Sequence, residues 1–168
     1  MYNNTKLLCV IFLCVFSLSS CTKDSISPEK NAELKTANLV DAFAYTQIEV
    51  DILTAVNDYR ESKGLSTLKR VDEITLQAES HTVYMVEKNA VNHDNFNVRF
   101  KNLVDEIGAK SVSENVGFGY STASAVVRAW IESEGHLANI EGDFTHFGVS
   151  VEQDENGRNY FTNIFVRR

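Results

Sequence analysis

The stretch FGVSVEQDENGRNYFTNIFV, residues 147–166, decides the fold because it holds two alternating segments on either side of a turn signal. Phe147, Val149 and Val151 each precede a small or polar residue, which is the period of a β-strand. A second alternating run covers residues 160–166, where Tyr, Thr, Ile and Val face one way and Phe, Asn and Phe the other. The dipeptide Asn156-Gly157 between them is typical of a hairpin turn. These residues predict an antiparallel hairpin.

Upstream of the hairpin, apolar residues recur at helical spacing. Four helices are predicted: from Gln47 to a stop at Gly64, from a cap at Asp72 through Met85, over Phe100–Ile107 up to Gly108, and from a cap at Ser121 or Thr122 through Ile131, ending near His136. A short strand is predicted at Glu114–Phe118. Helices first and antiparallel strands last indicate an α+β domain.

The N-terminus has the organisation of an export signal. Lys6 is the only charge in residues 1–20, and the apolar run 7–18 that follows is too short to span a bilayer. Leu18-Ser19-Ser20-Cys21 resembles the lipobox of bacterial lipoproteins. We therefore expect residues 1–20 to be removed and Cys21 to carry lipid. The protein would then be exported and lipid-anchored in the bacterial cell envelope, and if the cell is Gram-negative, at its outer membrane or cell surface.

Cysteine content and net charge further narrow the classes of protein to which the chain can belong. Cys9 and Cys14 lie within the signal, so the mature chain keeps one cysteine and can form no internal disulfide. The net charge is −7 with its charges dispersed, which argues against nucleic acid as a partner. Residues 21–46 are read as the lipidated cysteine and a polar tether, and residues 47–168 as one monomeric domain that needs no metal to fold.

Three residues outside the apolar stripes could carry chemistry. His93 stands in the polar segment 92–95, Glu114 opens a glycine-spaced segment, and His136 follows Gly135 near the end of the fourth helix. Two imidazoles and a carboxylate can bind zinc or another divalent cation, or can exchange protons. Their spacing alone leaves a second interpretation open, in which the histidines are loop and cap residues and Glu114 is a solvated acid.

A family resemblance brings the same residues together. The segment Val56–Leu68 resembles the motif VNxxRxxxGLxxL, Asn92-His93 stands where Ser-His is usual, and Glu114–Gly119 resembles ENIAxG. Residues 130–140 and 144–149 resemble WxxSxGHxxNI and FTHxGVG. The region 47–165 is thus identified as a compact, cysteine-free bacterial form of the CAP superfamily (cysteine-rich secretory proteins, antigen 5 and pathogenesis-related 1).

The resemblance implies an α-β-α sandwich, in which helices flank a small antiparallel sheet. It also implies a cleft with two histidines and two acids that binds a divalent ion in some members. His93, Glu114 and His136 match three of the four positions. The fourth is Ser133 here, with Glu132 and Glu134 on either side, so the second acid is left open between these two, and Glu132 is kept among the candidate residues. On an unbroken helix Glu132 and Glu134 would point to either side of the cleft.

Other polar residues receive structural interpretations. His81 lies on the apolar stripe of the second helix and is expected to be a hydrogen-bonded core residue. Trp130 is expected to anchor the fourth helix in the core. Ser133 has no partner base that the sequence reveals, which argues against a serine triad.

The residues favour a binding module over an enzyme. Its ligand would be a small molecule, a peptide or a divalent metal held in the His93–Glu114–His136 cleft. One alternative is a metal-assisted hydrolase in which Glu114 is a third ligand or the general base. The other is a non-catalytic adhesion or interaction domain whose cleft has no function.

Overall fold

The computed structural model describes residues 44–168, and the predicted signal peptide, the lipidation site at Cys21 and most of the predicted tether lie outside the described residues. The described elements are α2 (Gln47–Ser62), β1 (Lys69–Arg70), α3 (Asp72–Lys88), α4 (Phe96–Ile107), β2 (Ser111–Phe118), α5 (Ala123–Ile131), α6 (Glu134–Ile140), β3 (His146–Gln153) and β4 (Asn159–Arg167). Among these residues no helix has the length and apolar character needed to cross a membrane.

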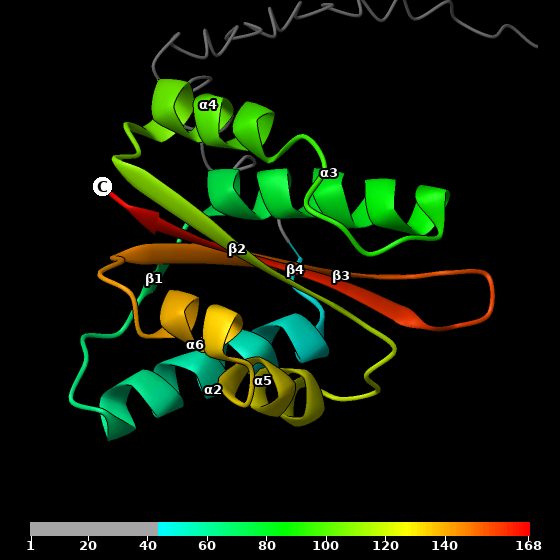
Figure 1. Cartoon of the computed structure of the whole chain (residues 1–168), viewed down its shortest axis with the longest axis horizontal. Helices are drawn as coiled ribbons and strands as arrows, with labels where there is room; N and C mark the ends of the chain where they lie inside the picture. Colours follow the sequence, from blue (N-terminus) through cyan, green and yellow to red (C-terminus); the bar gives the residue numbers. More distant parts are fainter. Residues whose placement is uncertain (1–43) are drawn as a thin grey trace, which may run out of the picture. The chain divides into compact units, whose positions relative to one another are not determined.

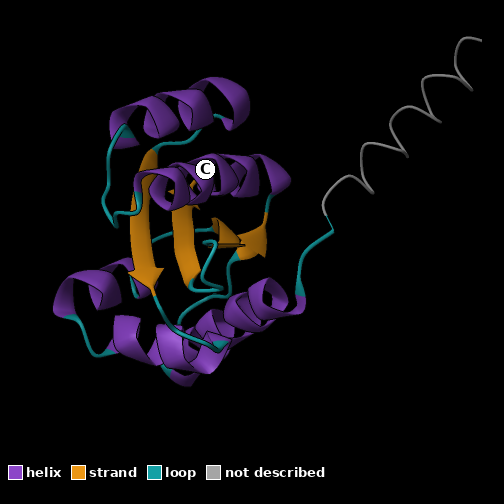
Figure 2. Cartoon of the chain, turned by 90° about the vertical axis from the view of Figure 1, so that its right-hand side faces the viewer, coloured by secondary structure: helices purple, strands orange, loops and turns teal. Residues whose placement is uncertain are grey.

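The sheet lies between two helical layers. Its strand order is β1-β3-β4-β2. Helices α3 and α4 cover one face, and α2, α5 and α6 cover the other (Figures 1 and 2). This confirms the α-β-α sandwich. The sheet differs from the expected antiparallel one at a single edge, where β1 pairs with β3 in parallel through Lys69 and Arg70.

The predicted hairpin is present, and both of its faces are buried. Phe161 and Phe165 pack into a core with α2 and α5, whereas Ile164 and Val166 pack on the other side with α3 and α4. The alternation along residues 160–166 therefore sorts side chains between two cores rather than between core and water. Asn156-Gly157 lies within a longer loop, because the last strand pair is Gln153 with Asn159.

Helix α4 differs from its prediction in its start and in its buried face. It begins at Phe96, and its buried residues are Arg99 and Leu103. Phe100 and Val104, which were expected to face the core, are 36% and 38% exposed. The inward face of this helix is thus partly polar, because it carries the partner of a buried acid. Asp72 is the first residue of α3 rather than its cap, which is Val71.

The predicted fourth helix is two helices. Thr122 caps α5 by accepting a hydrogen bond from the Ala125 N–H, and α5 ends at Ile131. Ser133 then adopts an extended conformation (φ −105°, ψ 117°) and α6 begins at Glu134. Trp130 is 2% exposed and donates its indole N–H to the Val116 carbonyl at 2.8 Å, as expected of a core anchor. His136 consequently belongs to the first turn of a separate helix.

Candidate functional site

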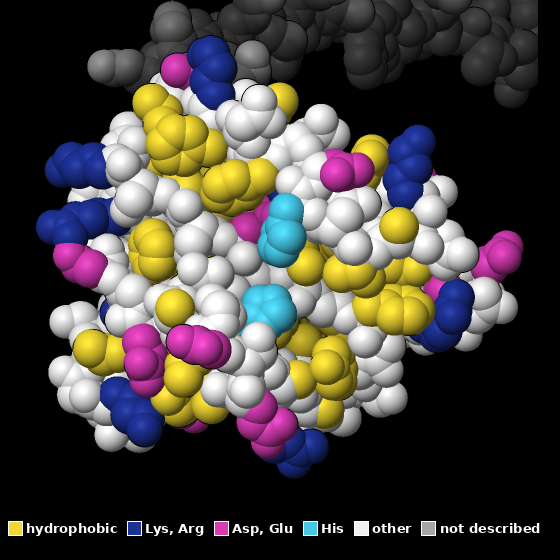
Figure 3. Space-filling view, viewed as in Figure 1, with side chains coloured by type: hydrophobic (Ala, Val, Ile, Leu, Met, Phe, Trp, Pro, Cys, Tyr) yellow, Lys and Arg dark blue, Asp and Glu magenta, His cyan; other side chains and the backbone are white. Residues whose placement is uncertain are grey.

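His93, Glu114 and His136 come from three different elements. His93 lies in the loop between α3 and α4, Glu114 in the middle of β2, and His136 in α6. Figure 3 shows two histidine side chains near one another at the centre of one face, with an acidic side chain directly beside one of them. The contacts around each residue define what the group can do.

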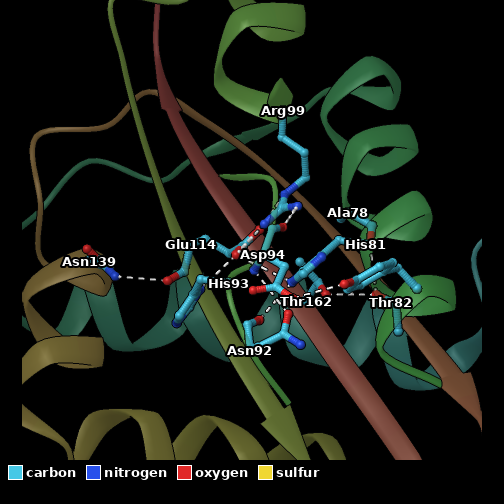
Figure 4. A network of polar contacts seen from close by, with 11 residues as sticks. Ala78, His81, Thr82, Asn92, His93, Asp94, Arg99, Glu114, Asn139 and Thr162 are labelled. Atoms are coloured by element: carbon cyan, nitrogen blue, oxygen red, sulfur yellow. Dashed lines mark hydrogen bonds and ion pairs between the residues drawn. The ribbon is translucent and has the colours of Figure 1, made fainter. Parts of the chain in front are cut away.

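Glu114 is buried and fully engaged. Its side chain is 1% exposed, and His93 Nδ1 lies 2.7 Å from Oε1. Arg99 donates Nε–H to Oε2 and Nη2–H to Oε1, both at 2.8 Å (Figure 4). Burial alone would raise the pKa of this carboxyl, but the hydrogen bonds from His93 and Arg99 and the Arg99 charge outweigh it and hold the pKa below its ordinary value. Glu114 is therefore an ionised anchor.

Arg99 is the residue that sequence reasoning missed. It projects from α4, is 5% exposed, and also donates Nη1–H to the Asp94 carbonyl at 2.6 Å. A signal was present in the sequence, because Arg99 stands four residues before Leu103 and so shares its inward helix face. A buried guanidinium requires an acid, and Glu114 is the acid that it finds.

His81 is a core residue, as expected, and also borders this network. It is 2% exposed, and its Nε2 lies 2.8 Å from the Asn92 carbonyl oxygen and 3.7 Å from Glu114 Oε1. Burial lowers the pKa of His81 despite the nearby carboxylate. The imidazole is therefore neutral near pH 7, and Nε2 carries the proton that Asn92 accepts.

His136 is held by Ser133 and Asn115. Ser133 Oγ lies 2.9 Å from His136 Nδ1, and the Asn115 side-chain amide donates to the His136 carbonyl at 3.1 Å. The sequence did not reveal this partner of Ser133, because the break before α6 is what turns the hydroxyl toward the ring. Burial lowers the pKa of His136, and the charge of His93 lowers it further, so the two rings interact electrostatically.

Glu132 does not join the group. Glu132 and Glu134 are both exposed, on either side of the break between α5 and α6. Within residues 44–168 neither forms a hydrogen bond or ion pair with His93 or His136. The chain is not helical at Ser133, so helical geometry does not govern where its neighbours point.

A hollow of about 310 Å³ adjoins the network. Its lining residues are His93, Phe96, Val112, Ser113 and Glu114. His136 is not among them, so the hollow includes two of the three predicted residues. Ser113 Oγ is buried without a hydrogen-bond partner in the described part of the chain. The wall that combines Phe96 and Val112 gives the hollow an apolar side.

The donor set fits a weakly held cation better than a tight one. In residues 44–168 no group of three or more His, Cys, Asp or Glu side chains is placed to hold a metal. Both carboxylate oxygens of Glu114 already form hydrogen bonds with Arg99 and His93. Each histidine uses Nδ1 internally, which leaves both Nε2 atoms as the available ligands. A carboxylate behind a histidine orients the ring and raises its basicity, which suits an outer-shell role for Glu114.

Comparison with known protein families matches the chain to one of them. The model of the cysteine-rich secretory protein family, CAP, matches residues 53–166. The uncharacterized membrane protein YlbC of Bacillus subtilis is 30% identical over 129 residues, which cover 73% of this chain and 35% of the relative. The uncharacterized protein YkwD of the same species is 31% identical over 105 residues, covering 60% of this chain and 41% of the relative. The chain thus spans less than half the length of either.

Solved structures show the same fold at lower identity. An outer surface protein of Borrelia burgdorferi has a TM-score of 0.66 at 18% identity, over 74% of this chain and 96% of that one. An extracellular protein of Bacillus anthracis that contains an SCP domain has a TM-score of 0.63 at 23% identity, over 85% of this chain and 44% of that one. At these identities the similarities support the fold alone. The chemistry of the site depends on the residues described above.

Proposed function

The chain belongs to the cysteine-rich secretory protein (CAP) family, and from that premise we propose that it is an exported, lipid-anchored binding module whose histidine cleft takes up a divalent cation reversibly. The observation that carries the proposal is the pairing of both Nδ1 atoms. His93 Nδ1 is held by Glu114, and His136 Nδ1 by Ser133. Both rings are thereby fixed with Nε2 available to a ligand.

Two imidazole ligands make a reversible site. Structural zinc sites in proteins are closed by four protein ligands, and catalytic ones use three. A cation held by His93 and His136 alone would keep water in its other positions. Such a cation could bridge the protein to a carboxylate or another donor group of a small ligand or peptide, while the apolar wall at Phe96 and Val112 contacts the rest of that ligand.

Binding is favoured over hydrolysis by the state of Glu114. A general base must offer a free oxygen within hydrogen-bond reach of the attacking water. Arg99 occupies both oxygens of Glu114 and stabilises the ionised form, which weakens it as a base. The exposed Glu132 forms no hydrogen bond or ion pair with either histidine in the described residues. The metal-assisted hydrolase therefore remains the less supported alternative.

Export and anchoring are supported by the N-terminal sequence and by the relatives. Leu18-Ser19-Ser20-Cys21 after a short apolar run has the form of a lipoprotein signal. One similar protein is named a membrane protein, and similar structures are named outer surface and extracellular proteins. A lipid on Cys21 would place the domain at the surface of a membrane.

Titration calorimetry with zinc at pH 7.5 tests the cleft. We expect the full chain to bind one zinc ion, and His93→Ala and His136→Ala each to lower the affinity at least tenfold. His146→Ala is the matched control, since His146 starts β3, belongs to neither α6 nor the α3–α4 loop, and has its Nδ1 hydrogen-bonded to Thr145 Oγ1. Equal affinity in all four proteins would exclude a metal site at His93 and His136.

The pH dependence gives a second readout. Zinc binds neutral imidazole, so protonation competes with it. The pKa of His136 is lowered from 6.5 by burial and by His93, so this ring stays neutral to a lower pH than an exposed histidine. Zinc affinity should fall as the pH drops through the ordinary histidine pKa of about 6.5, and protonation of His136 should contribute to that fall only below it. A decline that begins at pH 8 would indicate a ligand other than these histidines.

A further inference from the structure

A second pocket lies on the α3–α4 side of the buried ion pair. It has a volume of about 250 Å³ and is lined by residues of α3, by residues of α4 and by Asn95 just before α4. His93 and His136 are not among its lining residues, so it is distinct from the histidine cleft. Two of its lining residues, His81 and Arg99, are only 2% and 5% exposed. The pocket therefore ends on deeply buried polar groups.

His81 presents a hydrogen-bond acceptor to this pocket. Its Nε2 donates to the Asn92 carbonyl, and its lowered pKa keeps the ring neutral. In a neutral imidazole with hydrogen on Nε2, the other nitrogen carries a lone pair. Nδ1 of His81 forms no hydrogen bond within residues 44–168. An occupant that reaches it must offer an O–H or N–H donor.

Arg99 presents donors without presenting net charge. One hydrogen each of Nη1 and Nη2 is used, on the Asp94 carbonyl and on Glu114, so each of these nitrogens keeps a second N–H. The Glu114 carboxylate neutralises the guanidinium at 2.8 Å. An anionic occupant would compete with that carboxylate for a cation that is already paired. A neutral acceptor would not.

The rest of the pocket wall is uncharged and mostly polar. The amides of Gln77 and Asn102 bond to each other at 3.1 Å, which leaves the Gln77 nitrogen and the Asn102 oxygen available. Ser80 and Asn95 add a hydroxyl and a third amide at the exposed rim. Tyr84 lines one side as an aromatic ring that stacks with His81. Val98 adds an apolar contact, and it is 50% exposed.

We propose that this pocket binds a neutral sugar, with one pyranose ring seated between α3 and α4. A hydroxyl group both donates and accepts, so neighbouring hydroxyls can satisfy His81 Nδ1 and the Arg99 N–H groups together. Amide and hydroxyl side chains complement the hydroxyl-bearing edge of such a ring, and the exposed Val98 can contact its apolar face, since His81 and the Lys88 ammonium already contact the ring of Tyr84. The volume lies below the roughly 300–1,000 Å³ of drug-sized sites, which suits a single small ring.

Nuclear magnetic resonance titration of the full chain, labelled with 15N and held in detergent micelles, tests the proposal. The probes are glucose, mannose and N-acetylglucosamine, with glucuronate as the anionic comparison. At least one neutral sugar should shift the backbone amides of Ser80, Tyr84, Asn95 and Asn102, with a dissociation constant on the order of 1–10 mM. Glucuronate should bind no more tightly than the best neutral sugar.

Three variants locate the effect. Val98→Trp fills the rim of the pocket and should weaken binding at least tenfold, whereas Val104→Trp, also on exposed α4 surface, should bind within twofold of the wild type. His81→Phe keeps a ring and removes the acceptor, so its folded form should bind at least fivefold more weakly. No shift with any sugar at about 50 mM, shifts confined to His93 and His136, tighter binding of glucuronate, or full binding by Val98→Trp would each overturn the proposal.

Discussion

Glu114 is the residue on which the candidate site depends. Its ionised side chain is tolerated at 1% exposure because the guanidinium of Arg99 makes two parallel hydrogen bonds to it. The same carboxylate receives His93, and its backbone carbonyl accepts a hydrogen bond from the Asn139 amide of α6 at 3.3 Å. One strand residue thus connects the loop of one histidine, the helix of the other, and α4.

The pH dependence of stability should report this carboxylate. Its pKa in the folded protein lies below the ordinary value of 4.5, so its stabilising effect is complete above pH 4.5 and is lost as the pH falls through the folded value. Glu114→Gln should lower the urea midpoint at pH 7, and the gap from the wild type should narrow below pH 4.5. Glu73→Gln, at an exposed position of α3, should leave no such gap. A gap that widens in acid would contradict the role of Glu114.

Removing the partner cation should be costly. Arg99→Met leaves Glu114 buried without its bidentate partner, which typically costs about 3–5 kcal/mol of unfolding free energy. Urea unfolding followed by circular dichroism measures the loss. Lys101→Met is the control on the same helix, since Lys101 is 73% exposed and pairs with the exposed Asp105. Its effect should stay below about 0.5 kcal/mol.

A double variant distinguishes the loss of the ion pair from the loss of side-chain packing. Arg99→Met combined with Glu114→Leu replaces both charges by apolar groups, and such replacements are often neutral or stabilising. We expect the double variant to recover most of the stability lost in Arg99→Met. A double variant as unstable as the single one would show that packing of the Arg99 stem, and not its charge, accounts for the loss.

Individual residues of the site were predictable to different degrees. His93, Glu114 and His136 were identifiable because they stand in polar or glycine-rich segments outside the apolar stripes. Arg99 was not predicted because the apolar residues of α4 define a helical stripe that does not include it. That stripe places Phe100 and Val104 in the core, whereas the pairing of Arg99 with Glu114 turns the helix so that they face outward. A charged residue on the inward side of a helix indicates the buried face as well as an apolar residue does.

At the scale of elements, the break between α5 and α6 matters most. The segment 130–136 has no proline, and its only glycine lies within the second helix, so nothing in it marks a stop. The structure nevertheless places Ser133 in an extended conformation with its hydroxyl on His136. Tertiary contacts explain this, since α6 docks beside β2 through the Asn139 and Asn115 side chains. The local sequence does not indicate such contacts between distant segments.

The packing of α3 on β3 is tested at Gly148. A Cβ built there would lie 2.4 Å from the Thr75 backbone nitrogen and 2.7 Å from the Ile74 carbonyl carbon. Gly148→Ala must therefore push the first turn of α3 away from the sheet, at a cost of about 1–3 kcal/mol. Thermal unfolding should show a lower midpoint. An unchanged midpoint would mean that the helix can shift freely on the strand.

Gly135 is the matched control for that substitution. It lies in α6, and a Cβ there would meet nothing within 4 Å. Alanine in a helix is favoured over glycine by about 0.5–1 kcal/mol, so Gly135→Ala should raise the midpoint slightly. Opposite signs at the two glycines would show that close approach at Gly148, and not the loss of glycine itself, is responsible.

The class of the fold was predictable from the sequence, but the edge strand of its sheet and the burial of both sheet faces were not. Four helical patterns followed by a strong hairpin were sufficient for an α+β domain, and the family resemblance implied the α-β-α sandwich. Strand β1 was not predictable, because Lys69 and Arg70 form a two-residue parallel pairing with no alternating pattern. Even the strong hairpin pattern did not show that both faces of β4 are buried. Coverage of both faces is a property of the assembled layers.

The lower boundary of the domain should lie a few residues before α2. Tyr45 donates its hydroxyl to Asp72 at 3.1 Å and lies 2.6 Å from Thr75 Oγ1, and burial raises its pKa to about 12. Thr46 forms a capping box with Glu49. A chain of residues 43–168 should unfold cooperatively, and one of residues 47–168 should be less stable by about 1–3 kcal/mol. Equal midpoints in urea would place the boundary at Gln47.

Membrane attachment is the prediction that concerns the whole molecule. A thioether at Cys21 would carry two or three acyl chains, each worth about 0.8 kcal/mol per buried CH₂, and two chains suffice for stable anchoring. Cys21→Ser removes the sulfur nucleophile, so the protein should move from the membrane to the soluble fraction of a bacterial host. Ser20→Ala is the matched control, because it keeps a small residue before the cysteine, and it should remain with the membrane. Mass spectrometry of the mature chain should find the lipid on an N-terminal Cys21. An unmodified cysteine, or an N-terminus at another residue, would show that the export signal is of the ordinary secretory kind.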